Sequence, residues 1–133
     1  MFSHVTVGSN DLDRVGRFYD AVLLPIGLRQ RAVEPDGGPK SLCWVGAAPY
    51  PRFYVYSPYD GQPAIPGNGA MLAFIAPSPE AVVAAHSAGL MAGGTDEGAP
   101  GLRPQYAEDY FGAYLRDPDG NKVHLVHRPA LLG

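Results

Sequence analysis

Hydrophobic and polar residues follow two different periods in the first half of the chain. Residues 4–8 alternate in the manner of a strand, whereas residues 12–23 place apolar side chains three or four positions apart, which is typical of an amphipathic helix. Asn10 or Asp11 can cap this helix by accepting a hydrogen bond from a free backbone N–H. Turns that contain Gly, Pro and Asp then separate three predicted strands, at residues 28–33, 41–45 and 53–56.

The second half repeats this order after a connector at residues 60–67. A strand is predicted at 71–75, and Ser78-Pro79-Glu80 has the features of a helix start. A loop rich in Gly and Pro follows, and a hairpin with strands at 112–116 and 122–127 turns at Asp117-Pro118-Asp119-Gly120. When the sequence is aligned with itself at an offset of about half its length, predicted strands align with strands and the two predicted helices align with each other. The pattern therefore predicts a duplicated unit of strand, helix and three strands.

Alternation within the strands separates two kinds of surface. In the first strand Val5 and Val7 share one face, and His4 and Thr6 share the other. The strand at 53–56 shows the same separation, with aromatic and charged side chains opposite its apolar ones. We therefore expect an α+β fold in which helices cover one face of a curved mixed sheet, while the other face encloses a cleft for a small-molecule ligand.

Composition narrows the class of protein. The 133 residues carry a formal net charge of −3 and are 46% hydrophobic, and no basic block is present. These values argue against nucleic acid or an anionic membrane as the main partner. The single cysteine, Cys43, lies in the apolar run 42–45, as expected of a buried thiol in a reducing compartment. No signal peptide or membrane-spanning run is recognisable, so we expect a cytoplasmic protein.

Both ends of the chain carry motifs of a known family. The opening motifs are His4-Val5-Thr6-Val7, Asp11-Leu12-Asp13-Arg14 and Phe18-Tyr19, and the closing motif is Arg116-Asp117-Pro118-Asp119-Gly120-Asn121-Lys122. The chain thus resembles the vicinal oxygen chelate superfamily of glyoxalases, extradiol dioxygenases, fosfomycin-resistance enzymes and bleomycin-binding proteins. This resemblance implies one glyoxalase-like domain over residues 1–133. Its two βαβββ modules would span residues 1–66 and 67–133, and the protein would form a homodimer.

The resemblance also implies positions for a metal. In metal-dependent members, His, Gln or Glu ligands come from the first strand of each module and from the last strand of a module. These positions fall on His4, Met71 and His124. A thioether is a poor ligand for a hard divalent ion. The implied site is therefore degenerate: His4 and His124 would hold one divalent metal ion, and the position of Met71 departs from the pattern.

Other candidate binding residues lie on the open strand faces and on the loop after residue 100. Arginines can pair with a ligand carboxylate or phosphate, and tyrosines offer flat apolar surface with a polar tip. The same aromatic side chains can instead pack the loop or form a dimer interface. The candidate substrate-binding residues are Arg52, Tyr54, Tyr56, Met71, Arg103, Tyr106 and Tyr110.

Two hypotheses for function remain open from the sequence. In the first, a lyase or dioxygenase of the glyoxalase type uses the degenerate metal site to polarise vicinal oxygens of a substrate. In the second, a metal-free protein sequesters a ligand in an aromatic cleft, as bleomycin-binding members do. The intact His4 and the added His124 favour the first hypothesis, and Met71 favours the second. Fold analogy alone does not establish activity.

Overall fold

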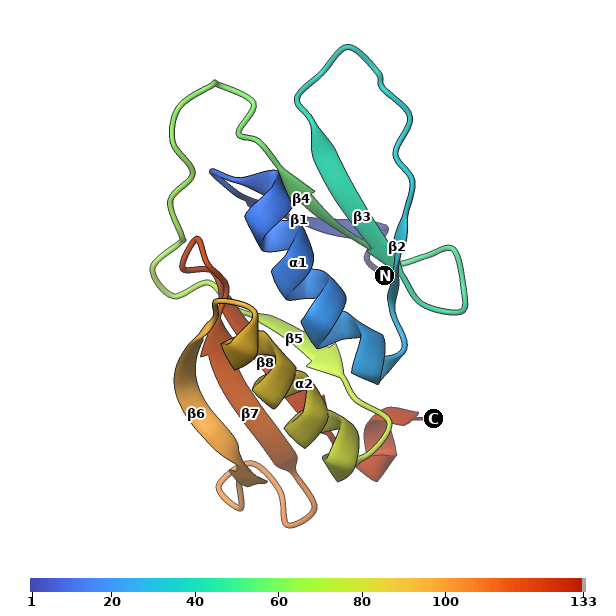
Figure 1. Ribbon diagram of the computed structural model, residues 1–133. Helices are drawn as coiled ribbons and strands as arrows, with labels where there is room; N and C mark the ends of the chain where they lie inside the picture. The colour runs from blue at the N-terminus through green and yellow to red at the C-terminus, as the bar shows by residue number, and fades with distance from the viewer. Residues whose placement is uncertain (133) are drawn as a thin grey trace.

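The computed structural model describes residues 1–132 and contains two units with the same order of elements (Figure 1). The first unit consists of β1 (His4–Gly8), α1 (Leu12–Leu23), the 3-10 helix η1 (Leu24–Ile26), β2 (Arg29–Arg31), β3 (Ser41–Val45) and β4 (Arg52–Tyr56). The second consists of β5 (Leu72–Ile75), α2 (Pro79–Met91), β6 (Thr95–Leu102), β7 (Phe111–Arg116), β8 (Lys122–His127) and the 3-10 helix η2 (Pro129–Leu132).

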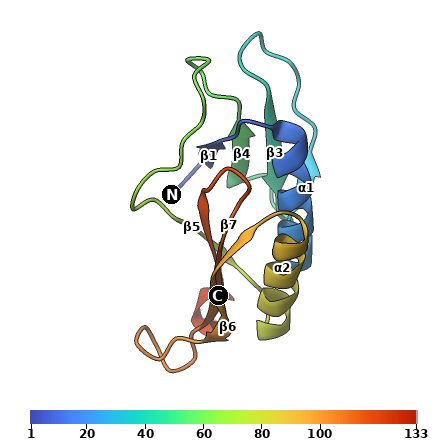
Figure 2. The same ribbon diagram turned by 60° about the vertical axis from the view of Figure 1, so that its left-hand side comes forward.

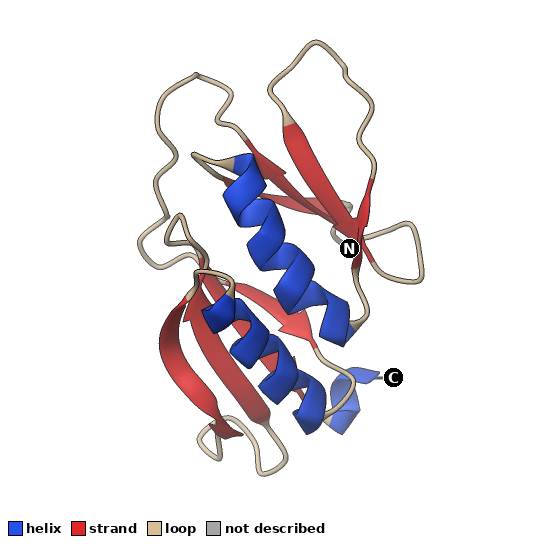
Figure 3. Ribbon diagram, viewed as in Figure 1, coloured by secondary structure: helices blue, strands red, loops and turns tan. Residues whose placement is uncertain are grey.

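The strands form two four-stranded sheets, with the orders β1-β4-β3-β2 and β5-β8-β7-β6. β1 pairs in parallel with β4, and β5 pairs in parallel with β8. The other neighbouring strands are antiparallel. The order of helices and strands along the chain is largely the one that the sequence pattern predicts (Figure 3). The predicted α+β, glyoxalase-like fold is therefore confirmed.

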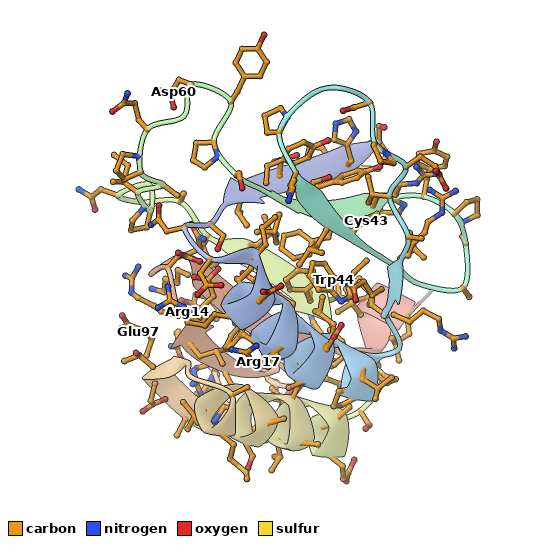
Figure 4. The ribbon with its side chains drawn as sticks, turned by 45° about the horizontal axis from the view of Figure 1, so that its top comes forward. Arg14, Arg17, Cys43, Trp44, Asp60 and Glu97 are labelled. Atoms are coloured by element: carbon orange, nitrogen blue, oxygen red, sulfur yellow. The ribbon has the colours of Figure 1, made fainter. Side chains whose placement is uncertain are left out.

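Both helices lie on one side of the two sheets and pack against each other (Figures 1 and 2). The side chain of Asp11 caps α1 by accepting a 3.0 Å hydrogen bond from the Arg14 backbone N–H, and Ser78 caps α2 in the same way. The core fills the space between helices and sheets. Figure 4 shows Trp44 of β3 beside α1. The rings of Phe53 and Phe74, 5.3 Å apart, join the two halves of this core.

The stretch after α2, predicted as a loop, instead forms the eight-residue edge strand β6. Its pairing with β7 is interrupted between Asp96 and Gly98 and again between Gly98 and Gly101. Gly and Pro normally indicate a loop, but an edge strand tolerates them because one side of its backbone has no partner strand. The irregular pairing also hides the period of two by which a strand is recognised.

Length and polarity of the helices also bear on membrane association. Within residues 1–132, no helix has both the length and the apolar character required to cross a bilayer.

Candidate functional site

The sheet faces turned away from the helices carry the candidate residues. On β1, His4 and Thr6 are exposed, whereas Val7 packs against the core. At the second sheet, Met71, just before β5, and Ile75, at the end of β5, are 45% and 47% exposed. Both sheets thus have one covered apolar face and one open face with polar, aromatic and apolar groups.

A cleft of about 700 Å³ lies over the open face of the first sheet. One wall comes from β1 and the end of β4, and the other comes from residues 58–65, the segment that leads toward the second module. Figure 4 shows Asp60 on this segment, beyond the edge of the strands. We call this site the connector cleft. Its lining residues are His4, Thr6, Val7, Gly8, Pro39, Tyr56, Pro58, Tyr59, Asp60, Gln62, Pro63, Ala64 and Ile65.

Aromatic contacts order the strand side of the connector cleft. The ring of Tyr54 lies edge-on to the His4 imidazole with centroids 5.6 Å apart, and Tyr56 follows at 5.7 Å from Tyr54. Nδ1 of His4 is 2.9 Å from the Ser3 hydroxyl. Tyr54 and Tyr56 are half-buried. Within this row His4 and Tyr56 line the cleft, so they offer a ligand an imidazole and an aromatic ring with a hydroxyl group, while Tyr54 contacts both from outside the lining.

His124 belongs to a second group of side chains, on the open face of the other sheet. Nδ1 is 2.9 Å from the carbonyl oxygen of Ala113, which can only accept, so Nδ1 carries the proton of the neutral ring. Nε2 then accepts a 2.7 Å hydrogen bond from the Tyr110 hydroxyl. The ring of Tyr114 stacks on the imidazole with centroids 4.1 Å apart. We call the group Arg103, Tyr106, Tyr110, Tyr114 and His124 the His124 cluster.

Burial determines which protonation states the His124 imidazole and the Tyr114 phenol favour. His124 is 2% exposed, and this burial lowers the pKa of its imidazole. Burial, followed by the interaction with Tyr106, raises the pKa of Tyr114 to about 12. The imidazole and phenol are therefore both favoured in their neutral forms, which leaves the Arg103 guanidinium as the charged group of the cluster.

The two candidate arginines already have partners within the chain. Arg103 donates to the backbone oxygens of Ala99 at 2.7 Å and Gly101 at 2.9 Å, so it is held against the irregular end of β6. Arg52 donates to the Tyr54 hydroxyl at 3.2 Å. Met71 does not line the connector cleft but a smaller hollow, together with Lys122, and this hollow shares Thr6 and Val7 with the cleft. The structure thus brings His4 and Tyr56 together in the connector cleft, and it brings Arg103, Tyr106, Tyr110 and His124 together elsewhere.

A catalytic site for a divalent ion normally provides three protein ligands. His4 and His124 lie on different sheets, and both ring nitrogens of His124 are engaged in hydrogen bonds. Across residues 1–132, no group of three His, Cys, Asp or Glu side chains is placed to hold an ion. The residues of a single chain therefore do not fit the implied metal, and no chemical step is derived through one.

Sequence analysis missed several residues of the connector cleft. Tyr59, Asp60 and Gln62 lie on a segment that was interpreted only as a connector. The length of the segment and the presence of a tyrosine in it are the available sequence signals, because binding groups concentrate on long loops. Thr6 was placed on the correct face but was not proposed as a binding residue.

Comparison with known proteins agrees with this architecture. The family model of the glyoxalase/bleomycin resistance protein/dioxygenase superfamily matches residues 1–125, so the chain belongs to this superfamily. This finding confirms the resemblance seen in the sequence. A search of curated proteins found no match.

Solved structures resemble the chain over most of its length. A glyoxalase/bleomycin resistance protein from Albidiferax ferrireducens T118 is 44% identical, with a TM-score of 0.83 over 97% of this chain and 99% of that one. An antibiotic binding protein from Streptomyces sp. CB03234 is 17% identical, with a TM-score of 0.66 and 96% of each chain covered. A lactoylglutathione lyase from Agrobacterium tumefaciens is 20% identical, with a TM-score of 0.64 over 100% of this chain and 96% of that one. The last two likenesses concern the fold alone.

Proposed function

We propose that this protein binds a planar, largely apolar small molecule in the connector cleft and that binding requires no metal ion. The cleft itself carries the proposal. Its volume of about 700 Å³ lies within the roughly 300–1,000 Å³ of typical ligand sites. The rings of Tyr56 and Tyr59 and several prolines supply apolar surface. A few polar groups, among them His4 and Thr6, can fix a ligand's orientation.

Two observations favour binding over metal-assisted catalysis. His4 lines the connector cleft, but the other candidate ligand, His124, belongs to the His124 cluster and has no free ring nitrogen. In addition, the antibiotic binding protein from Streptomyces sp. CB03234 has the same fold. This second observation is an analogy of fold and supports only the class of function.

A fluorescence titration with Nile red, a neutral planar dye, tests the proposal. We expect saturable binding to the wild type and markedly weaker binding by Thr6→Phe, because a phenyl ring on this exposed strand position would take up part of the cleft. Thr95→Phe is the matched control, since Thr95 is also an exposed strand residue but lies on β6, outside the cleft. Equal binding by the wild type and both variants would contradict the proposed site.

The same titration after dialysis against EDTA tests metal independence. We expect an unchanged dissociation constant. If EDTA abolished binding and one added equivalent of a divalent ion restored it in the wild type but not in His4→Ala, the metal-free proposal would be overturned. The lyase or dioxygenase hypothesis would then become the better account.

A further inference from the structure

Residues 58–66, which form the outer wall of the connector cleft, have few attachments to the rest of the molecule. Within the part of the chain that the structure describes, the hydrogen bonds that join this segment to other residues are two, and both involve Asn10. The Ala64 backbone N–H donates to Oδ1 of Asn10 at 2.7 Å, and Nδ2 of Asn10 donates to the Ala64 carbonyl at 3.1 Å. One carboxamide thus holds both backbone groups of one wall residue.

Asn10 is itself held by the second module. Its backbone N–H donates a 2.9 Å hydrogen bond to Oδ1 of Asp119, in the turn between β7 and β8. The Asp119 side chain is only 1% exposed, and its other oxygen accepts from the Ser9 hydroxyl. Nδ2 of Asn121 reaches the Gly8 carbonyl at 3.0 Å. The turn therefore fixes the end of β1, from which Asn10 extends toward the wall.

Close packing at Gly8 shows how near the wall approaches the strand. A Cβ atom placed on Gly8 would lie 3.1 Å from Cβ of Ala64, which is closer than side chains normally approach. The absence of a side chain at Gly8 therefore allows the wall to come within reach of the Asn10 carboxamide. The wall side chains themselves add little packing, since Tyr59 and Ile65 are 93% and 85% exposed.

From these contacts we infer that Asn10 is a positioning residue of the connector cleft, which holds the wall at Ala64 in the geometry that receives a ligand. The inference rests on the proposed function and adds to it a residue outside the cleft lining. If the wall is already ordered in the free protein, the free energy of ligand binding does not include the entropic cost of ordering it. Without the Asn10 side chain, that cost would fall on the ligand, and affinity would decrease while the core stays intact.

The test compares Asn10→Ala, Asn10→Asp and the control Asn68→Ala with the wild type. Asn10→Asp keeps an acceptor for the Ala64 N–H but loses the donor to the Ala64 carbonyl, so its effect is expected to be intermediate. Asn68 is also exposed and follows the wall in sequence, and within residues 1–132 its side chain makes no hydrogen bond. Three quantities are measured: hydrogen exchange of the Ala64 amide by NMR, the Nile red dissociation constant and the urea midpoint.

For Asn10→Ala we expect the free protein to exchange the Ala64 amide faster, because this amide loses its acceptor. The loss of two hydrogen bonds predicts a rise in the Nile red dissociation constant of roughly five- to hundredfold. The urea midpoint should stay at the wild-type value, as should all three quantities in Asn68→Ala. Saturating Nile red should restore protection of Ala64 in Asn10→Ala, a response that a purely structural role would not produce.

The outcomes separate this inference from the proposed function. If the wild type binds Nile red and Asn10→Ala matches it in both affinity and Ala64 exchange, the positioning role is overturned and the proposed function stands. If Asn10→Ala loses affinity while Ala64 exchange is unchanged, the positioning role is also overturned, because the loss has another origin. If the wild type fails to bind any planar probe, the proposed function fails, and faster Ala64 exchange in Asn10→Ala would then show a wall tether without a ligand-binding role.

Discussion

The hydroxyl of Tyr19 donates a 2.7 Å hydrogen bond to Oδ2 of Asp117, and both side chains are buried. Tyr19 lies on α1, while Asp117 directly follows β7, so this bond joins the two modules. Asp117 also accepts from the backbone N–H groups of Asp119 and Asn121 and from Nδ2 of Asn121. The terminal turn is therefore a structural junction, with its carboxylate directed inward.

Replacing Tyr19 with phenylalanine should weaken this junction. Asp117 would remain buried with one donor fewer, and a hydrogen bond lost from a buried polar group costs about 1–3 kcal/mol in free energy of unfolding. Urea denaturation would measure the change. Tyr59→Phe is the control, because Tyr59 is 93% exposed. Equal midpoints for Tyr19→Phe and the wild type would show that the bond contributes nothing to stability.

Asp117 should also impose a pH dependence on stability. Burial raises the pKa of this carboxyl, and its hydrogen bonds only partly oppose the shift. The folded protein therefore binds this proton more tightly than the unfolded chain does. The contribution of Asp117 to the free energy of unfolding should fall as pH rises from the unfolded pKa near about 4 through the higher folded pKa.

The variant Asp117→Asn isolates this effect, because all other titrating groups are common to both proteins. Urea denaturation between about pH 3.5 and pH 6 would give the two stability curves. The stability of the wild type minus that of Asp117→Asn should decrease with rising pH. An increase over the same range would mean that the hydrogen bonds, rather than burial, dominate the pKa of Asp117.

The sequence predicted the fold well because its helices and most strands have a clear hydrophobic period. Asp11 and Ser78 cap the two helices as expected. The strand β6 was missed because Pro100 and its neighbouring glycines favour a loop in any local interpretation. Pairing with β7, a long-range interaction, decides its structure instead.

The sites were less predictable because they depend on distances across the fold. The family pattern already places His4 and His124 in different modules, but the sequence could not show whether the two sheets bring these side chains together. No local pattern could show that Tyr110 reaches Nε2 of His124. Likewise, the role of Asn10 follows only from its contact with Ala64, which lies 54 residues away in sequence.

Gly89 lies where α2 packs against both α1 and β7. A Cβ atom at this position of α2 would lie 2.5 Å from Cδ1 of Leu115 and 2.8 Å from Cγ2 of Val22. Both neighbours are fully buried, so they have little room to move. Overpacking of this kind costs about 1–3 kcal/mol, whereas alanine gains only about 0.5–1 kcal/mol over glycine in helix propensity. Gly89→Ala should therefore destabilise the protein.

The control for this prediction is Ala84→Gly, at an exposed position of the same helix. It should cost only the propensity difference of about 0.5–1 kcal/mol. Chemical denaturation of both variants would compare the cost of overpacking directly with the difference in helix propensity. A Gly89→Ala protein more stable than the wild type would mean that the helices separate readily and that their contact is loosely packed.

Asp60 should make the connector cleft selective for ligand charge. Among the described residues that line the cleft, it is the only Asp, Glu, Lys or Arg. A unit charge about 6 Å away in water interacts by roughly 0.7 kcal/mol, which corresponds to about a threefold change in affinity. We therefore expect the cationic tricycle proflavine to bind more tightly than the anionic tricycle anthracene-2-carboxylate. Asp60→Asn should reduce this preference by removing the attraction and the repulsion together.

Net charge must be separated from local charge in this comparison. Glu80→Gln changes the net charge by the same amount, but Glu80 lies on α2, on the helix side of the molecule. It should leave both dissociation constants unchanged. The preference of the wild type should also fade as salt rises toward about 1 M, where the screening length is about 3 Å. Equal effects of Asp60→Asn and Glu80→Gln would show that the probes respond to the whole protein's charge and would argue against a ligand seated beside Asp60.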